Sequence, residues 1–161
     1  MKTILVAMTL LGSMLFAADA TNLLKPTNQV ESWRFEIAGD SKSEMKVEGD
    51  EVVFITSAVD NTNWHVQAVQ NELDLSDGTT YVLKFSAKSP EKVLMGLNAM
   101  IDQEDWHQIG LNEEVQLGKE YKDFRFEFTA SGTVKKANRI SFVLGNNKGT
   151  VSLKDVTLIA K

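Results

Sequence analysis

The chain has 161 residues, a formal net charge of −5 and no cysteine. A mildly acidic balance argues against nucleic acid and against anionic membrane surfaces, because both attract basic proteins. Without disulfides, a domain of this length must be held together by its hydrophobic core, with or without a bound metal ion.

The first twenty residues have the pattern of an export signal. Lys2 supplies a positive charge, an apolar run extends from Ile4 to Phe16, and Ala18-Asp19-Ala20 fits a small-x-small cleavage site. The apolar run is short for a membrane span, although an uncleaved anchor is the alternative. We predict a signal peptide over residues 1–20 and a secreted, periplasmic or cell-surface protein with no membrane attachment after cleavage.

The rest of the chain alternates between apolar and polar side chains, which is the period of a β-strand. The pair Gly49-Asp50 separates two such runs as a tight hairpin turn. In the last run the alternation changes phase between Leu153 and Val156, which predicts a bulge near Lys154-Asp155. The alternating runs cover residues 33–37, 44–47, 52–55, 81–88, 123–128, 139–144 and 150–159.

About nine or ten short strands, each with one apolar face, must bury these faces against one another. Two packed antiparallel sheets are the economical arrangement. No segment with helical period reaches three turns. We therefore predict a single all-β domain over residues 21–161, built as an antiparallel β-sandwich or jelly roll.

Catalytic motifs are missing from the sequence. It has two histidines, His65 and His107, but no G-x-S-x-G elbow, phosphate-binding glycine loop or H-E-x-x-H motif. Asp102, Glu104 and Asp105 crowd into one stretch, whereas a glycosidase needs two carboxyls that face each other across a cleft. We interpret this stretch as a solvated loop. The two histidines have no further ligands at the spacing that a zinc site requires, so we expect no zinc site. Because the catalytic motifs are also missing, we expect that the chain is not an enzyme.

The three tryptophans have different surroundings. Trp33 shares its parity with other apolar residues, so we place it in the core. Trp64 and Trp106 each lie among amides and acids, and a histidine follows each of them. Aromatic rings stack on the apolar face of a sugar while amides and acids bond its hydroxyl groups. These two rings therefore predict a carbohydrate-binding surface, and the alternative is that they cap the core.

The strand that follows Trp64 leaves one question open. With regular alternation, Trp64, Val66 and Ala68 share one face and Gln67 points to the other. A bulge would instead turn Gln67 to the side of Trp64. We keep Gln67 as a candidate contact in a groove that contains Trp64.

Several segments follow one another in a recognisable order. They are Asn22-Leu23-Leu24, Trp64 to Ala68, Leu73-x-Leu75, Asp77 to Lys88, Tyr121 to Phe128, Arg139 to Gly145 and Val151 to Leu158. In this order and spacing they resemble the family 4/9 carbohydrate-binding modules and the related family 22 modules. The resemblance extends over nearly all of residues 21–161.

The resemblance implies a jelly roll with a groove that binds a polysaccharide such as β-glucan or xylan, beside a separate glycoside hydrolase. It implies stacking contacts by Trp64 and Trp106 and a polar contact by Asn146. It also implies that Asp155 matches an acid that holds a structural calcium ion in the family. The segment 26–31 departs from the family pattern at the second calcium ligand, so we expect no required cofactor, with calcium at Asp155 as an option.

The competing hypothesis is a structural or adhesive cell-surface sandwich that binds protein partners through exposed edge strands. Alanine at Trp64 and Trp106 would leave such binding intact. A small glycosidase or lyase is the third hypothesis, and Asp105→Asn would abolish its turnover. Solvent exposure of the two rings on one sheet face distinguishes carbohydrate binding from the other two.

Overall fold

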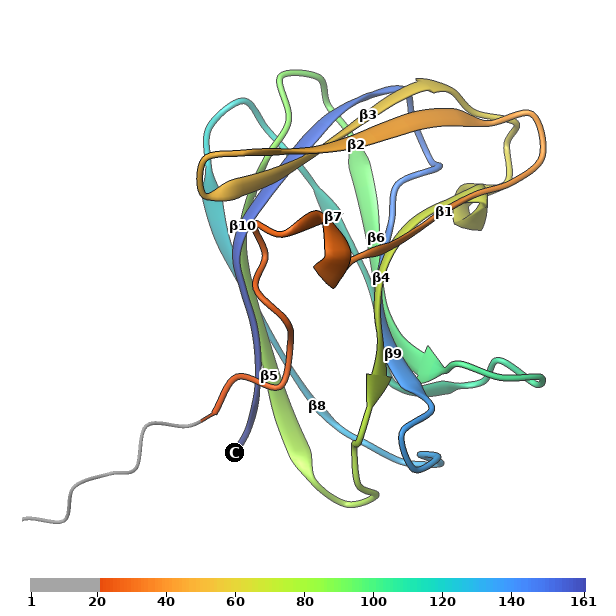
Figure 1. The fold of residues 1–161 in the computed structure, drawn as a ribbon, viewed down its shortest axis with the longest axis vertical. Coiled ribbons are helices and arrows are strands. Elements are labelled where there is room, and N and C mark those ends of the chain that lie inside the picture. The colour runs from red at the N-terminus through yellow and green to blue at the C-terminus, as the bar shows by residue number, and fades with distance from the viewer. Residues whose placement is uncertain (1–20) are drawn as a thin grey trace, which may run out of the picture.

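The computed structural model describes residues 21–161, so the predicted signal peptide over residues 1–20 lies outside it. The described chain forms ten strands in two five-stranded sheets that pack face to face (Figure 1). All strand pairs are antiparallel, and the predicted all-β sandwich is confirmed. No helix in residues 21–161 is long and apolar enough to cross a membrane. The elements are η1 (Val30–Ser32), β1 (Arg34–Ile37), β2 (Lys42–Glu48), β3 (Glu51–Ala58), η2 (Asn63–His65), β4 (Val66–Leu73), β5 (Thr80–Lys88), β6 (Leu94–Ile101), β7 (Gln108–Gln116), β8 (Lys122–Thr129), β9 (Asn138–Val143) and β10 (Gly149–Ala160), where η is a 3-10 turn.

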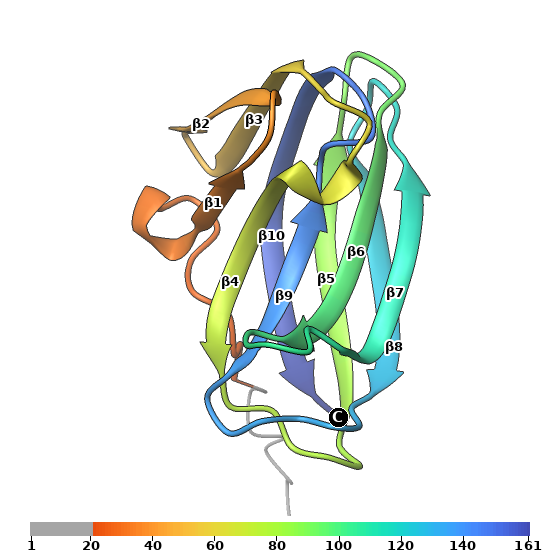
Figure 2. The ribbon, with the colours of Figure 1, turned by 90° about the vertical axis from the view of Figure 1, so that its right-hand side faces the viewer.

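The strand order is β1-β4-β9-β6-β7 in one sheet, which we call the front sheet, and β2-β3-β10-β5-β8 in the other, the back sheet. Figure 2 looks onto the outer face of the front sheet. Most neighbours in a sheet are distant in sequence, as in the pairing of β9 with β4 and β6. The outer face of the front sheet is therefore assembled from residues spread over more than half of the chain.

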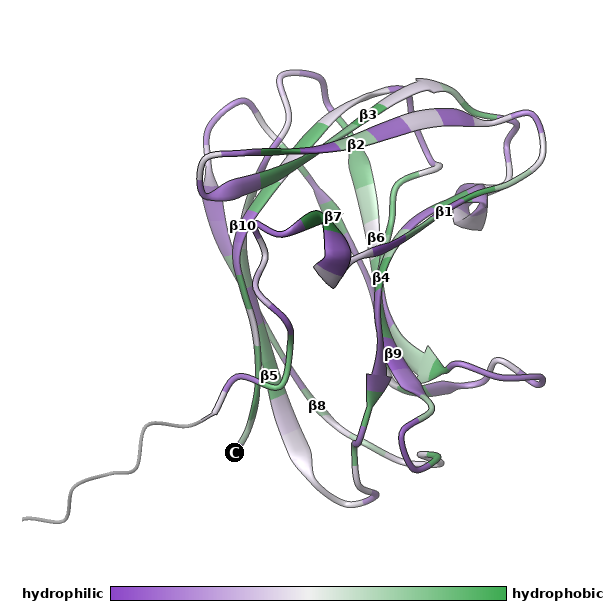
Figure 3. Cartoon of the chain, viewed as in Figure 1, coloured by the Kyte–Doolittle hydropathy of each residue, from purple (hydrophilic) through white to green (hydrophobic). Residues whose placement is uncertain are grey.

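The core lies between the sheets, where one side of each strand is apolar. Hydrophobic and hydrophilic positions alternate along the strands (Figure 3). Phe142 of the front sheet meets Phe85 of the back sheet edge-on, with ring centroids 5.3 Å apart. Trp33 packs edge-on against Phe142 at 5.8 Å, and its indole N–H donates to the carbonyl oxygen of Thr27. Trp33 is thus a core residue, as predicted.

The predicted hairpin and bulge are both confirmed. Glu48 pairs with Glu51, so Gly49-Asp50 is a two-residue turn between β2 and β3. The register of β10 against β5 shifts after Lys154, and Asp155 has a φ of 54°. This bulge leaves backbone groups without ladder partners, and the N-terminal segment supplies them.

Two side chains hold the bulge. The Oδ1 of Asn22 accepts a hydrogen bond from the N–H of Leu158 at 2.9 Å, and the Oγ1 of Thr27 accepts one from the N–H of Val156 at 3.0 Å. The first residues of the domain are therefore tied to its last strand.

Candidate functional site

The outer face of the front sheet contains a groove of about 670 Å³. All five strands and the segments before β4 and after β6 contribute to its walls. Four spacings between five strands of about 4.8 Å each make the sheet about 19 Å wide. A groove of this length suits an extended ligand better than a small compact one.

Trp64 and Trp106 flank the groove from opposite ends of the strands. Trp64 belongs to η2, directly before β4, and Trp106 belongs to the turn between β6 and β7. Figure 2 shows these two segments at opposite ends of the front sheet, and in Figure 1 both project away from the back sheet. The side chains are 56% and 49% exposed, and both line the groove. The alternative that they cap the core is wrong.

The parity argument for the segment after Trp64 needs a correction. Trp64 lies in a 3-10 turn rather than in the strand, so the turn decouples its direction from that of β4. Val66 and Ala68 are fully buried in the core, and Gln67 between them lines the groove without any bulge. The Nε2 of Gln67 donates to the carboxylate of Glu36 at 3.4 Å. The interpretation by regular alternation, in which Val66 and Ala68 share the face of Trp64, is therefore wrong, and so is the alternative that Gln67 needs a bulge to reach the groove.

Several buried polar atoms at the floor of the groove have no hydrogen-bond partner in the described part of the chain. Ser141 on β9 and Asn98 on β6 are register neighbours, and Asn112 on β7 is the next residue across. Within residues 21–161, the Oγ of Ser141, the Oδ1 of Asn98 and the Nε of Arg139 are buried and form no hydrogen bond. Leaving such a group unpaired costs about 1–3 kcal/mol. Asn98 and Arg139 line the groove and Ser141 is buried beside Asn98, so the first two are the residues that a ligand or water in the groove would meet.

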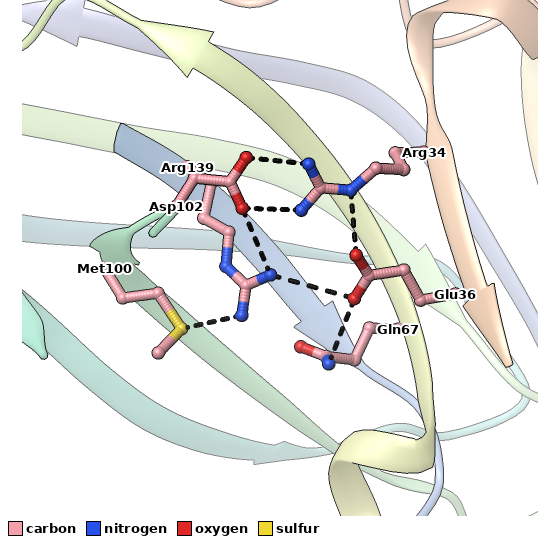
Figure 4. A network of polar contacts seen from close by, with 6 residues as sticks. All are labelled: Arg34, Glu36, Gln67, Met100, Asp102 and Arg139. Carbon is pink, nitrogen blue, oxygen red and sulfur yellow. Dashed lines mark hydrogen bonds and ion pairs between the residues drawn. The ribbon is translucent and has the colours of Figure 1, made fainter. Parts of the chain in front are cut away.

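A cluster of four charged residues lies beside this floor (Figure 4). Arg34 donates two hydrogen bonds to the carboxylate of Asp102, at 2.7 and 2.6 Å, and its Nε is 2.8 Å from Glu36. Arg139 lies 3.7 Å from Glu36 and 3.5 Å from Asp102. Two guanidinium groups and two carboxylates balance one another, so the cluster is rigid and carries no excess charge.

Asp102 does not belong to a solvated loop, which corrects our interpretation of the acidic stretch. Its side chain is only 12% exposed, whereas Glu104 and Asp105 are exposed. The hydrogen bonds from Arg34 hold the pKa of Asp102 below its ordinary value. Burial lowers the pKa of Arg139, and the charges of Glu36 and Asp102 oppose that effect. The cluster therefore fixes side chains of the groove and keeps Asp102 ionised.

Asn146 lies in a second, more polar hollow of about 490 Å³ that shares Asn63 and Trp64 with the main groove. Its Nδ2 donates to the carbonyl oxygen of Leu94 at 3.2 Å, which leaves the amide oxygen as an acceptor. The structure thus places Asn146 in a hollow that Trp64 also lines, outside the main groove.

Asp155 is exposed on β10 of the back sheet and does not join the groove. Residues 21–161 contain no group of three or more His, Cys, Asp or Glu residues that could hold a metal ion. Calcium takes about six to eight oxygen ligands, whereas the bulge at Asp155 is already fixed by Asn22 and Thr27. The described residues do not fit a carboxylate-built calcium site, and calcium at Asp155 stays a prediction.

Most floor residues were missed because strands β6 and β7 show no clean alternation. Met95, Leu97 and Ala99 face the core, but Met100 on the outward side is also apolar, so the segment reads as a continuous apolar run. The amides at Asn98 and Asn112 were the available signal. Isolated amides at alternate positions of a buried strand lie on one face of the sheet, and they indicate that this face meets a polar ligand.

The sandwich, the flanking rings and the unpartnered floor define a binding domain for an extended polar ligand. A family model described as "Carbohydrate binding domain", that of the family 4/9 modules, matches residues 21–149. The chain belongs to this family of carbohydrate-binding domains, and the resemblance seen in the sequence is confirmed.

Solved structures share the fold. A structure described as "CBM4 structure and function" is similar with a TM-score of 0.75 at 22% identity, over 86% of this chain and 93% of that one. The N-terminal cellulose-binding domain of β-1,4-glucanase C from Cellulomonas fimi gives 0.69 at 19% identity, over 88% and 98%. The CBM22-1 xylan-binding domain from Paenibacillus barcinonensis gives 0.59 at 8% identity, over 88% and 95%. No curated protein sequence matches the chain.

Proposed function

We propose that this chain binds polysaccharides of the β-glucan or xylan type in the groove of the front sheet, without catalysis. The observation that carries the proposal is the pair of exposed rings, Trp64 and Trp106, with unpartnered polar atoms on the floor between them. Rings stack on the C–H faces of sugars, and the floor amides bond sugar hydroxyl groups. The cellulose- and xylan-binding domains with this fold support the same ligand class.

The proposed ligand runs across the strands, with Trp64 on one side of it and Trp106 on the other. Gln67, Val143, Gly96 and Glu114 form one register row from β4 to β7. Gly96 has no side chain in the middle of this row, and a Cβ there would approach the Cβ of Val143 to 3.0 Å. The floor is therefore lowest at Gly96, which leaves space for a sugar ring to lie close to the backbone.

The arrangement of carboxyls supports binding rather than hydrolysis. Glycosidases need two carboxyls about 5–9.5 Å apart, one of them with a raised pKa. Glu36 and Asp102 both contact the Nη1 of Arg139, at 3.7 and 3.5 Å, so they are close enough for such a pair, but both are also paired with Arg34. Asp102 is held ionised by Arg34, which is the opposite of what a general acid requires.

We further propose that the domain is exported after cleavage behind Ala20 and acts outside the cell or in the periplasm, holding polysaccharide for a separate glycoside hydrolase. The positive, apolar and small-residue regions of residues 1–20 support export. An N-terminal mass beginning at Thr21 in exported material is the expected result, and an intact Met1 to Ala20 segment would contradict it.

Titration with soluble cello-, laminari- and xylo-oligosaccharides tests the ligand class. We expect saturable changes in tryptophan fluorescence and matching heats by calorimetry for at least one of the three series, with affinity rising with chain length. Chromatography of the same mixtures should show no shortened products. The adhesive alternative would be favoured if none of the three series gave a binding signal and if a protein partner were captured equally well by the Trp64→Ala and Trp106→Ala variants.

A further inference from the structure

Trp106 sits in a strained turn that needs support from its neighbours. Asp105 and Trp106 have φ values of 89° and 47°, in the left-handed region that residues other than glycine rarely adopt. Such conformations persist only where surrounding contacts fix them. The orientation of the Trp106 ring is therefore set by what touches this turn.

One support lies under the ring. The guanidinium carbon of Arg139 is 5.1 Å from the centre of the Trp106 ring. Arg139 is 5% exposed, and Glu36, Asp102 and the Sδ of Met100 surround its guanidinium (Figure 4). One face of the ring thus rests on a fixed cation, and the ring is still half exposed for a ligand.

The second support is His107, whose imidazole joins two loops. Its Nδ1 lies 2.9 Å from the carboxylate of Asp105, and its Nε2 lies 2.7 Å from the carbonyl oxygen of Gly132, between β8 and β9. Both partners can only accept hydrogen bonds, so both ring nitrogens must donate. Only the protonated imidazolium does so.

Other features of the loops fit a protonated His107. Asp77, between β4 and β5, accepts a hydrogen bond from the N–H of Thr133, next to Gly132, and its charge, like that of Asp105, raises the pKa of His107. The backbone N–H of Thr133 lowers the pKa of Asp77 and keeps it charged. A Cβ at Gly132 would come within 2.8 Å of the His107 Nε2, so the glycine permits the close approach.

We propose that His107 is a positioning residue for Trp106, and that its bridge to Gly132 makes the ligand affinity of the groove depend on pH. The inference rests on the proposed function of the groove. With the imidazolium, the turn is tied to the β8–β9 segment and the Trp106 ring is held over Arg139. A neutral imidazole satisfies only one of the two acceptors, so the turn loses an attachment and the ring loses its fixed orientation.

The direction of the pH effect follows from the bonds. The hydrogen bonds to Gly132 and then to Asp105 raise the pKa of His107 above its ordinary value of 6.5. A raised folded-state pKa means that the bridge is complete below about pH 6.5 and is lost as the pH rises through the raised value. Affinity should therefore be highest under mildly acidic conditions and fall on the alkaline side.

Trp64 provides an internal comparison. His65, which follows it, places its Nδ1 2.7 Å from the carboxylate of Asp60, and its Nε2 has no acceptor within residues 21–161. One ring nitrogen therefore has a partner, and His65 does not tie its turn to a second loop. The pH dependence should therefore follow Trp106 and not Trp64.

The test measures the affinity of the mature chain for the best oligosaccharide of the three series at about pH 6 and about pH 9, where groove carboxylates stay ionised. We expect wild type to lose about fivefold in affinity at the higher pH. His107→Gln should bind equally at both, near the alkaline value of wild type. Trp64→Ala should bind more weakly but keep the pH dependence, and Trp106→Ala should lose it.

A second measurement needs no sugar and separates this inference from the proposed function. In Trp64→Phe the exposed tryptophan is Trp106, since Trp33 is buried. Acrylamide quenching should increase from pH 6 to pH 9 in this variant, and the increase should vanish when His107→Gln is added. If the chain bound no sugar but quenching still increased from pH 6 to pH 9, only the proposed function would be wrong. If quenching did not change with pH, or if the affinity of His107→Gln still fell at pH 9, the positioning role of His107 would be wrong.

Discussion

The two sheets bury similar apolar faces but differ in their outer faces. The outer face of the back sheet carries charged residues that pair with one another, such as Lys46 with Glu48 at 2.6 Å and Arg125 with Glu127 at 2.8 Å. Exposed pairs of this kind contribute about 0–1 kcal/mol each and leave no group unsatisfied. The charged groups of this face are therefore satisfied by one another and by water.

The outer face of the front sheet, in contrast, contains polar groups without hydrogen-bond partners among the described residues. It exposes Trp64 and Trp106, and it buries the Oγ of Ser141 and the Oδ1 of Asn98 without partners among the described residues. The four charges around Arg139, in contrast, balance one another. The difference shows that exposed rings and unsatisfied groups distinguish the binding face of this sandwich.

The largest effect should come from removing the rings. Trp64→Ala and Trp106→Ala should each weaken oligosaccharide binding by about thirtyfold, the scale of a stacked hot-spot residue, and the double variant should bind below detection. Because both rings are exposed, the melting temperature should hardly change. Arg125→Ala on the back sheet is the matched control and should bind like wild type. If Arg125→Ala lost as much oligosaccharide affinity as the tryptophan variants, the front sheet would not be the specific binding face.

A smaller effect, with opposite signs for stability and affinity, is expected at the floor. Ser141→Ala removes a buried hydroxyl that has no partner within residues 21–161 and that lies beside the groove residue Asn98, so the free energy of unfolding should rise by about 1 kcal/mol while affinity falls about fivefold. Denaturant unfolding and calorimetry measure the two quantities. Ser152→Ala, at a buried outward serine of the back sheet, should leave affinity unchanged. A loss of stability in Ser141→Ala would show that the hydroxyl is satisfied in the free protein.

The smallest effect on affinity should come from the N-terminal segment. Asn22→Ala removes the acceptor of the Leu158 N–H and should lower stability by about 1–3 kcal/mol while leaving sugar binding unchanged. Thermal melts with calcium and with a chelator belong to the same experiment. Since Asn22 and Thr27 already fix the bulge, we expect no shift with calcium. A rise in melting temperature on adding calcium, lost in Asp155→Asn, would instead support the calcium site.

The back sheet was easier to predict from the sequence than the binding face. Strands β2 and β8 alternate between exposed and less exposed side chains, so their pattern is visible in the sequence, and the turn at Gly49-Asp50 and the bulge at Asp155 followed from local patterns. Trp64 was identified by its amide-rich surroundings, but its direction depends on a 3-10 turn that alternation does not reveal.

The polar floor could not be predicted because its contacts are long-range. Arg34 and Asp102 are 68 residues apart and meet only because β1 and β6 lie in the same sheet. The neighbours of Ser141 likewise come from β4 and β6, on both sides of β9. The alternating run 139–144 showed that Arg139 and Ser141 share a face, but which residues stand beside them is a property of the strand order.

Nuclear magnetic resonance of the three indole N–H groups tests the central claim most directly. During titration with the best oligosaccharide, the signals of Trp64 and Trp106 should move together and saturate at one affinity. The signal of Trp33, whose N–H is buried on the carbonyl of Thr27, should stay in place. Shifts confined to back-sheet residues, or a titration that moves neither exposed indole, would contradict a sugar site between these rings.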